Sequence, residues 1–320
     1  MNQVNQVIGD ELKAFEQKFT ESVKSQAPLL DRIMKYIIKR KGKQMRPMFV
    51  FLSAKLFGQV NESTYRAAAL VELLHTATLV HDDVVDESME RRGFFSINAI
   101  WKNKIAVLVG DYLLSKGLLL ATENNDFEHL HILSEAVKQM SEGELLQIEK
   151  ARKLDIDEQV YYNIIKSKTA SLLASACAVG AFSTSNNKDI ADKMRSFGEK
   201  VGIAFQIKDD LFDYGNDKVG KPTGNDIREK KMTLPLIYTL QQADSSLKRK
   251  LIYTVKNKAE NKDSIQFVID SVKRAGGIEY ATLAMIKHRD EALSILNSFP
   301  DSNEKQALKE LVEFTTNRNY

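Results

Sequence analysis

The sequence predicts an all-α protein, and the distribution of proline is the main reason. Proline occurs five times in 320 residues, and none lies between Pro47 and Pro222. Proline inside a helix removes a hydrogen bond and clashes with the preceding turn. A proline-free stretch rich in Ala, Leu, Ile, Lys and Glu therefore favours long uninterrupted helices. No segment alternates polar and apolar residues as paired strands do. Because no low-complexity linker interrupts the chain, we expect one all-helical domain over residues 1–320.

The expected elements follow in chain order. Pro47 suits the first position of a helix that runs towards Gly58. Longer helices are predicted at residues 63–87, 105–122, 130–150, 158–182 and 189–213, with a polar turn at 183–188. Residues 214–231 contain glycine, proline and several basic residues, which favours a mobile lid. The rest of the chain predicts three or four more helices, with breaks at Gly276-Gly277 and at Pro300.

Composition excludes several classes of function. The net charge is +3, from 46 basic and 43 acidic residues, so the sequence lacks the excess of basic residues that is typical of nucleic-acid binding. Cys177 is the only cysteine, so no intrachain disulfide can form and a reducing compartment is expected. The first 19 residues are charged and amphipathic, unlike a signal peptide, and no apolar run reaches the length of a membrane span. We expect a cytoplasmic protein with, at most, a peripheral membrane contact.

Two acidic clusters carry most of the functional information. Residues 82–86 read Asp-Asp-Val-Val-Asp, and residues 209–213 read Asp-Asp-Leu-Phe-Asp, each after an apolar run. We call them the first and the second acidic cluster. Residues four apart share a helix face, so the outer two aspartates of each cluster point the same way. Carboxylates this close repel one another unless a cation neutralises them. Hard oxygen ligands suit Mg²⁺, which commonly binds one or two carboxylates together with substrate phosphates. Two facing clusters would therefore hold a metal-bound diphosphate, although a single cluster could be a solvated acidic helix end.

Several other features point to diphosphate binding. A basic loop at residues 39–47, which includes Lys43 and Arg46, precedes a helix start and favours an anion. Arg91 and Arg92 follow the first cluster, and arginine binds phosphate oxygens bidentately. His75 lies nearly two turns before Asp82 and should share its face. Lys168, Thr169 and Gln206 place polar groups within otherwise apolar helices and need partners there. Each feature alone could equally be a solvated surface or a core hydrogen bond.

Taken together, these residues resemble the trans-polyprenyl diphosphate synthases of the isoprenoid synthase superfamily. The resemblance runs from the basic loop near Lys43 to Pro235. It includes the segments KGKQMRP, HTATLVHDDVVDESMERRG, GDYLLSKG, GELLQ, KTA, FQIKDD and GKPTGNDIREKKMTLP. Lys41 and Gln44 stand where the family often has Gly and Arg, and Lys230 stands where relatives often have Gly. The order and spacing of the segments are highly specific together. The resemblance implies an orthogonal bundle of long helices around a central cavity, and a homodimer.

The resemblance also implies a role for each matching residue. Three Mg²⁺ ions would be bound by Asp82, Asp86 and Asp209, with Asp83 and Asp213 in support. The allylic diphosphate would be held by Arg91, Lys168, Lys221 and Lys231. Isopentenyl diphosphate would be bound by Lys43, Arg46, His75 and Arg92. Thr169 and Gln206 would lie near the reacting allyl group.

The resemblance implies that side chains of the helix before the first cluster set the length of the product. Short-chain relatives place bulky aromatic residues four or five positions ahead of that cluster, where this chain has Thr78 and Ala77. Leu74 and Val71 continue the same stripe, and neither is aromatic. The resemblance therefore implies a long product of the hexaprenyl to octaprenyl class, for a quinone side chain. The alternatives are a farnesyl or geranylgeranyl diphosphate synthase, a terpene cyclase, a non-catalytic synthase subunit or a metal phosphohydrolase built on His81 and Asp82.

Overall fold

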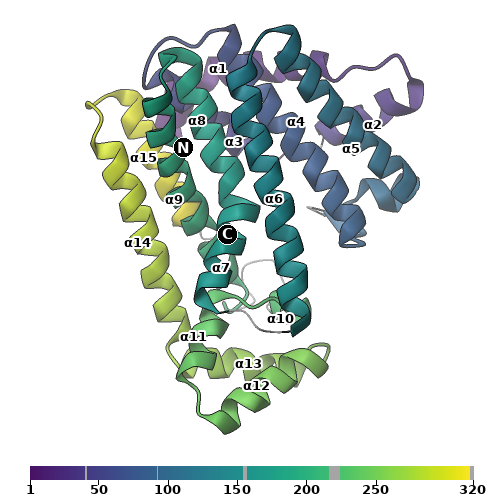
Figure 1. Cartoon of the computed structure of the whole chain (residues 1–320), viewed down its shortest axis with the longest axis vertical. Coiled ribbons are helices and arrows are strands. Elements are labelled where there is room, and N and C mark those ends of the chain that lie inside the picture. Colours follow the sequence, from purple (N-terminus) through teal and green to yellow (C-terminus); the bar gives the residue numbers. More distant parts are fainter. Residues whose placement is uncertain (40–41, 92, 154–156, 216–223, 318–320) are drawn as a thin grey trace. The chain divides into compact units, whose positions relative to one another are not determined.

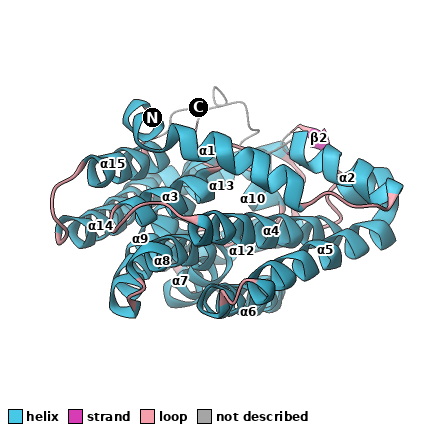
Figure 2. Ribbon diagram, turned by 90° about the horizontal axis from the view of Figure 1, so that it is seen from above, coloured by secondary structure: helices cyan, strands magenta, loops and turns pink. Residues whose placement is uncertain are grey.

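The computed structural model confirms the all-α prediction. It describes residues 1–39, 42–91, 93–153, 157–215 and 224–317. The helices of these segments are shown in Figures 1 and 2. In order they are α1 (Asn2–Ser22), α2 (Pro28–Lys39), α3 (Met45–Lys55), α4 (Glu62–Val85), α5 (Ile97–Glu123), α6 (Phe127–Lys153), α7 (Glu158–Ile165), the π-helical turn η1 (Lys166–Ala170), α8 (Ser171–Ser185), α9 (Lys188–Phe212), α10 (Asn225–Arg228), α11 (Leu234–Gln242), α12 (Ser245–Asn257), α13 (Lys262–Arg274), α14 (Gly277–Asn297) and α15 (Asn303–Thr316).

The long predicted helices are present. The chain after residue 231 was expected to form three or four helices, and the structure corrects this, since its described part holds five, α11 to α15. Two of the long helices differ locally from the prediction. The predicted helix at 158–182 contains a π-helical turn at Lys166–Ala170, where the amide of Ser171 donates to the carbonyl of Lys166 five residues earlier. The predicted helix at 105–122 begins at Ile97, and its backbone leaves helical geometry at Lys102. A small antiparallel hairpin, β1 (Glu90–Arg91) and β2 (Phe94–Phe95), was not predicted. Its strands are two residues long, which is too short for an alternating pattern to show in the sequence.

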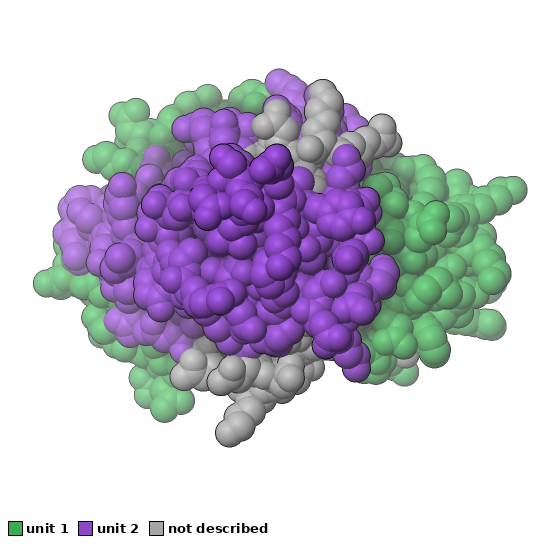
Figure 3. Space-filling model, turned by 90° about the horizontal axis from the view of Figure 1, so that it is seen from below, with its two compact units in different colours: residues 1–137, 175–195, 300–310 green, residues 138–174, 196–299, 311–320 purple. Residues whose placement is uncertain are grey.

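The chain forms two compact units, coloured separately in Figure 3. Unit 1 comprises residues 1–137, 175–195 and 300–310, and unit 2 comprises residues 138–174, 196–299 and 311–320. In unit 1, helices α4 and α5 pack along each other around an apolar cluster that includes Leu73, Ala77 and Leu113. In unit 2, α11 packs on α13 and α14 around a cluster that includes Ile207 and Leu234. The predicted single domain over residues 1–320 stays a prediction.

Helix α5 corrects the expectation that no segment could span a membrane. It is long and apolar enough for a bilayer by length and composition, although a helix of a soluble protein can pass the same test. Only a third of its most apolar window is buried. The buried part packs on α4, where Gly117 lies against Leu70 and Gly110 lies against His81. The exposed part carries Val107, Leu108, Leu118 and Leu119.

Candidate active site

The first acidic cluster lies at the C-terminal end of α4 in unit 1. This helix begins with a capping box between Asn61 and Thr64, and its apolar face is buried along most of its length. Asp82 is half-buried, Asp83 is buried and Asp86 is exposed. The amide of Asp86 donates to the carbonyl of Asp82 at 2.8 Å, so the helical spacing persists to Asp86. Asp82 and Asp86 therefore share a face, as the sequence predicted.

The chain after the cluster turns back through the hairpin. Gly93 has a φ of +76°, a conformation that glycine adopts without a side-chain clash. The hydroxyl of Ser96 donates to the carbonyl of Ser88 at 2.6 Å and accepts the amide of Ala99 at 3.3 Å, so Ser96 joins the hairpin to the start of α5. Arg91 is the last residue of β1. Its side chain and the whole of Arg92 lie outside the described part of the structure, so their predicted roles stay predictions.

The predicted isopentenyl diphosphate residues that the structure describes all belong to unit 1. Lys43 is exposed in the loop before α3, and Arg46 is half-buried in the first turn of that helix. Gln44 adopts a φ of +52°, the left-handed region that glycine favours. His75 is buried on α4, nearly two turns before Asp82. The structure thus places a loop cation, a helix-start cation and a buried imidazole in the same unit as the first cluster.

The second acidic cluster lies at the C-terminal end of α9 in unit 2. Asp209 is half-buried, whereas Asp210 is buried. Asp210 accepts hydrogen bonds from the Tyr161 hydroxyl at 2.7 Å and from the Gln206 amide at 2.9 Å. Burial, reinforced by the nearby charge of Asp226, raises the pKa of Asp210 to about 7. This network gives Gln206 the polar partner that the sequence required of it.

The π-helical turn positions two predicted reaction residues. The hydroxyl of Thr169 donates to the amide oxygen of Gln206 at 3.0 Å, which ties η1 to α9. Lys168 forms an ion pair with Glu144 of α6. Glycine allows this close packing, because a Cβ on Gly202 would lie 2.6 Å from Cα of Ala170 and one on Gly143 would lie 2.7 Å from Cβ of Ser167. Such turns occur frequently at functional sites.

Asp213 anchors the segment that follows the second cluster. Its carboxylate accepts the backbone amides of Asn225 at 2.7 Å and Asp226 at 3.2 Å, at the start of α10. Both carboxylate oxygens are thus engaged by the backbone, and the predicted supporting role of Asp213 at the metal site stays a prediction. Burial raises the pKa of Asp213, and the backbone hydrogen bonds oppose that shift.

Lys231 lies close to two carboxylates in the same unit. Its ammonium is 3.6 Å from Asp226 and 2.5 Å from Glu229. Burial acts to lower the pKa of Lys231, but the attraction of Asp226 and Glu229 outweighs it, so the pKa is raised. Lys230 adopts a φ of +57°, at the position where relatives often have glycine. Residues 216–223, which include the predicted Lys221 and the middle of the predicted lid, lie outside the described residues.

The residues of both clusters suit a divalent metal. In the described part of the chain, no three His, Cys, Asp or Glu side chains form a cage that could hold a metal by themselves. Mg²⁺ needs no such cage, since it binds through one or two carboxylates and retains water or substrate phosphate oxygens. The spaced carboxylates of Asp82 and Asp86, half-buried and exposed, fit that chemistry.

The predicted chain-length residues lie on the apolar side of α4. Val71, Leu74 and Ala77 are buried, and Thr78 is half-buried with its hydroxyl donating to the carbonyl of His75 at 2.9 Å. Ala77 belongs to the apolar cluster between α4 and α5. The structure therefore buries three of the four residues along α4, and their role in product length stays a prediction.

The sequence missed three polar residues of unit 2. Tyr161 gave no signal, because a tyrosine in an apolar helix is ordinarily a core residue. Asp226 lies in a recognisable segment, yet nothing in that segment showed that it would lie near Asp210 and Lys231. Glu144 lies in the GELLQ segment, and its pairing with Lys168 depends on the close approach of α6 to η1.

The helical fold carries an acidic cluster at the C-terminal end of a long helix in each unit, an arrangement that suits an enzyme acting on metal-bound diphosphate esters. The chain belongs to the polyprenyl synthetase family, which it matches over residues 27–272. It is a trans-prenyltransferase.

Individual relatives agree with this membership. The chain is 31% identical to the octaprenyl diphosphate synthase of Escherichia coli over 99% of both chains. A polyprenyl synthase from Caulobacter crescentus, solved with calcium and isoprenyl diphosphate, superposes with a TM-score of 0.91 at 31% identity, covering 99% of this chain and 97% of that one. The geranylgeranyl pyrophosphate synthase of Bacteroides thetaiotaomicron gives a TM-score of 0.84 at 37% identity, covering 99% of this chain and 100% of that one.

Proposed function

We propose that this protein elongates an allylic diphosphate by successive condensation with isopentenyl diphosphate and releases a long-chain all-trans polyprenyl diphosphate. The observation that carries the proposal is the pair of acidic clusters, each at the end of a long helix of this prenyltransferase family. The expected product belongs to the hexaprenyl to octaprenyl class and would supply a quinone side chain. The octaprenyl diphosphate synthase among the relatives supports a long product.

The charged residues have complementary roles in this proposal. Mg²⁺, three ions in all, would be bound by Asp82, Asp86 and Asp209 and would neutralise the diphosphate so that it can leave. The family member solved with calcium and isoprenyl diphosphate supports a divalent metal. Arg91, Lys168, Lys221 and Lys231 add positive charge to the same diphosphate. Lys43, Arg46, His75 and Arg92 hold isopentenyl diphosphate, whose double bond is the nucleophile.

The uncharged residues protect the reacting carbon. Departure of diphosphate leaves an allylic cation, which has to be kept from water. Thr169 and Gln206 are joined by a 3.0 Å hydrogen bond, so their polar atoms satisfy each other instead of recruiting solvent. After the new carbon–carbon bond forms, a proton is lost to the departed diphosphate, and the product is an allylic diphosphate one unit longer.

We also propose that the protein is a homodimer that associates through α5. Leu108 and Leu119 are 56% and 52% exposed, and the three turns between them place both on one face. Val107 and Leu118 repeat the same spacing alongside. An exposed apolar stripe of this kind is characteristic of a covered interface. A cytoplasmic location and a peripheral membrane contact that releases the apolar product complete the proposal.

The test is an incubation with labelled isopentenyl diphosphate, Mg²⁺ and geranyl, farnesyl or geranylgeranyl diphosphate in turn, followed by chromatography of the dephosphorylated products. Polyprenols of the hexaprenyl to octaprenyl class confirm the proposal. Geranylgeraniol as the end product would instead favour the short-chain activity of the Bacteroides relative. Cyclic hydrocarbons would indicate a cyclase, and activity only with a homologous partner would indicate a synthase subunit.

A further inference from the structure

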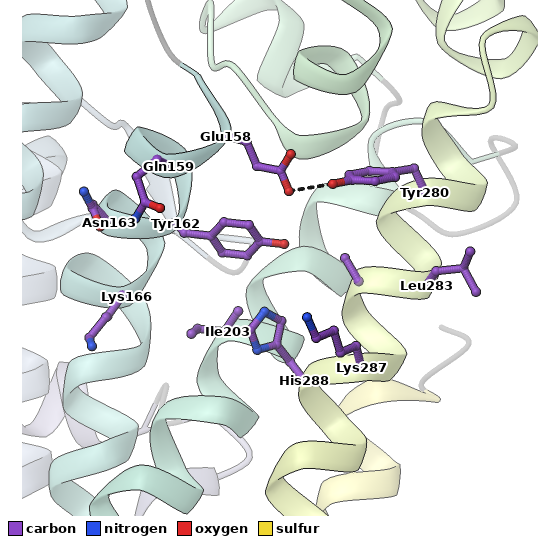
Figure 4. Close-up of a pocket in the computed structure, with 11 residues that line it drawn as sticks. Glu158, Gln159, Tyr162, Asn163, Lys166, Ile203, Tyr280, Leu283, Lys287 and His288 are labelled. Carbon is purple, nitrogen blue, oxygen red and sulfur yellow. Dashed lines mark hydrogen bonds between the residues drawn. The ribbon is translucent and has the colours of Figure 1, made fainter. Parts of the chain in front are cut away.

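Unit 2 contains a cavity of about 600 Å³ that the proposed reaction does not use. It lies between α7 and α14, as Figure 4 shows. The side chains of Tyr162, Ile203 and His288 line it together, and Leu283 and Ala284 add apolar surface from α14. None of these residues has a role in the mechanism proposed above. A volume of this size is typical of sites for small organic ligands.

Two hydrogen-bond donors in this cavity have no acceptor among the described residues. The side chain of Lys287 lies beside His288 in the cavity lining (Figure 4). Its ammonium forms no ion pair within the described segments, although its charge acts on Glu291 one turn further along α14. The hydroxyl of Tyr162 likewise has no hydrogen-bond partner within those segments. Burial raises the pKa of Tyr162 to about 12, so this hydroxyl keeps its proton and can donate.

The other charges near the cavity are already paired. Glu158 accepts the hydroxyl of Tyr280 at 2.7 Å. Lys166 lies 3.1 Å from Glu199, and Lys200 lies 2.7 Å from Glu291. Burial, together with the charge of Lys200, lowers the pKa of His288, which keeps this ring neutral at pH 7. Among the described residues that line the cavity, Lys287 is therefore the one cation without an ion pair, and one negative charge on a ligand would match it.

The walls favour a flat ring. The rings of Tyr162 and His288 are 5.5 Å apart and tilted, and Ile203 lies in the same lining. Aromatic rings pack well against such surfaces and lose little conformational freedom on binding. We propose that this cavity is a regulatory site for a small aromatic carboxylate, whose ring contacts Tyr162 and Ile203 and whose carboxylate pairs with Lys287 and the Tyr162 hydroxyl.

The position of the cavity connects it to the reaction residues of unit 2. Tyr162 follows Tyr161, which donates to Asp210. Lys166, on the cavity wall, is the first residue of the π-helical turn that contains Thr169. Ile203 lies on α9 one turn before Gln206. A ligand here contacts the helices that hold the second cluster in place, without competing for the diphosphate residues.

Binding is tested by calorimetric titration of the full-length protein with 2-naphthoate, using the uncharged 2-naphthalenemethanol and inorganic phosphate as comparison probes. The naphthoate should bind, and both comparison probes should bind far more weakly. Lys287→Ala should weaken naphthoate binding about tenfold or more, because a charge-assisted hydrogen bond is lost. Tyr162→Phe should weaken it several-fold, and Lys248→Ala, which changes an exposed lysine of α12, should leave it unchanged.

Turnover tests the regulatory role separately. Saturating 2-naphthoate should change kcat in the wild-type protein and have no effect on Lys287→Ala. No binding, or equal binding by the Lys287 and Lys248 variants, would refute the site. Binding without any change in kcat would refute its regulatory role. Because the titration needs no turnover, failure of the proposed prenyl transfer would leave the binding result interpretable.

Discussion

The hydroxyl of Tyr161 donates to the Oδ2 atom of Asp210 at 2.7 Å, and both side chains are buried. The partly hydrated Asp209 lies directly before Asp210 in the chain. One helix end thus presents a carboxylate suited to metal binding next to a carboxylate fixed by protein donors. Through this hydrogen bond, Tyr161 ties α7 to the end of α9.

Tyr161→Phe should lower the free energy of unfolding by about 1–3 kcal/mol, because Asp210 then loses a buried hydrogen-bond donor. Urea denaturation in metal-free buffer measures the change. Tyr253→Phe, at an exposed tyrosine of α12, is the matched control and should leave the midpoint unchanged. Identical midpoints for the two variants would show that the Tyr161 contact contributes nothing.

Asp82→Ala and Asp209→Ala should each reduce kcat by at least about 100-fold, since each removes charge that stabilises the departing diphosphate. Neither variant should melt at a lower temperature, because removing one carboxylate relieves repulsion within its cluster. Turnover across a Mg²⁺ series and thermal melting check both expectations. Glu260→Ala removes an exposed carboxylate in unit 2 and serves as the control. Near-normal turnover with unchanged Mg²⁺ dependence would contradict the assignment.

Ala77→Phe and Ala77→Tyr should shorten the product markedly at a similar rate of starter consumption, because a ring on this face of α4 would block the growing chain. Overpacking of the cluster around Ala77 should cost about 1–3 kcal/mol of stability. Ala77→Val, with a smaller side chain, should give products of intermediate length. Chromatography of the dephosphorylated products decides the matter, and unchanged length in all three variants would show that the chain grows along another route.

Leu119→Glu should convert the protein from dimer to monomer, because the substitution buries a charge in the proposed α5 interface. Light scattering over a concentration series gives the mass. Tyr253→Glu introduces the same charge at a residue that is exposed on α12 and should leave the dimer intact. A wild-type protein that is monomeric at working concentrations would contradict the interface outright.

Features that depend on local spacing could be predicted from the sequence. Asp82 and Asp86 share a face because they are four residues apart in a helix, and the helix itself followed from an uninterrupted apolar pattern. The partnership of Gln206 with Asp210 is of the same kind, since both lie on α9 one turn apart. The basic residues near each cluster could also be predicted from the sequence, because they lie in the same sequence segments as the aspartates.

Features that depend on contacts between distant segments could not be predicted. Tyr161 is 49 residues away from Asp210 along the chain, and no periodicity links the two. The π-helical turn arises where Lys166–Ala170 packs against Gly143 and Gly202 of other helices, a tertiary effect that local propensity does not contain. The left-handed backbone conformation of Gln44 and Lys230 could not be predicted either, because neither residue type favours that conformation on its own.

The π-helical turn at Lys166–Ala170 has a consequence for how the gene can change. A π turn is an α-helical turn with one residue more, and it takes up that residue while the helices before and after it keep nearly the phase of one continuous α-helix. Deleting Ser167 should therefore restore an ordinary α-helix and leave Tyr161 facing Asp210. A second deletion from the same turn has no extra residue to remove, so it would rotate α7 by about 100° relative to α8 and turn Tyr161 away from Asp210. One single-codon deletion here should therefore be far less damaging than two.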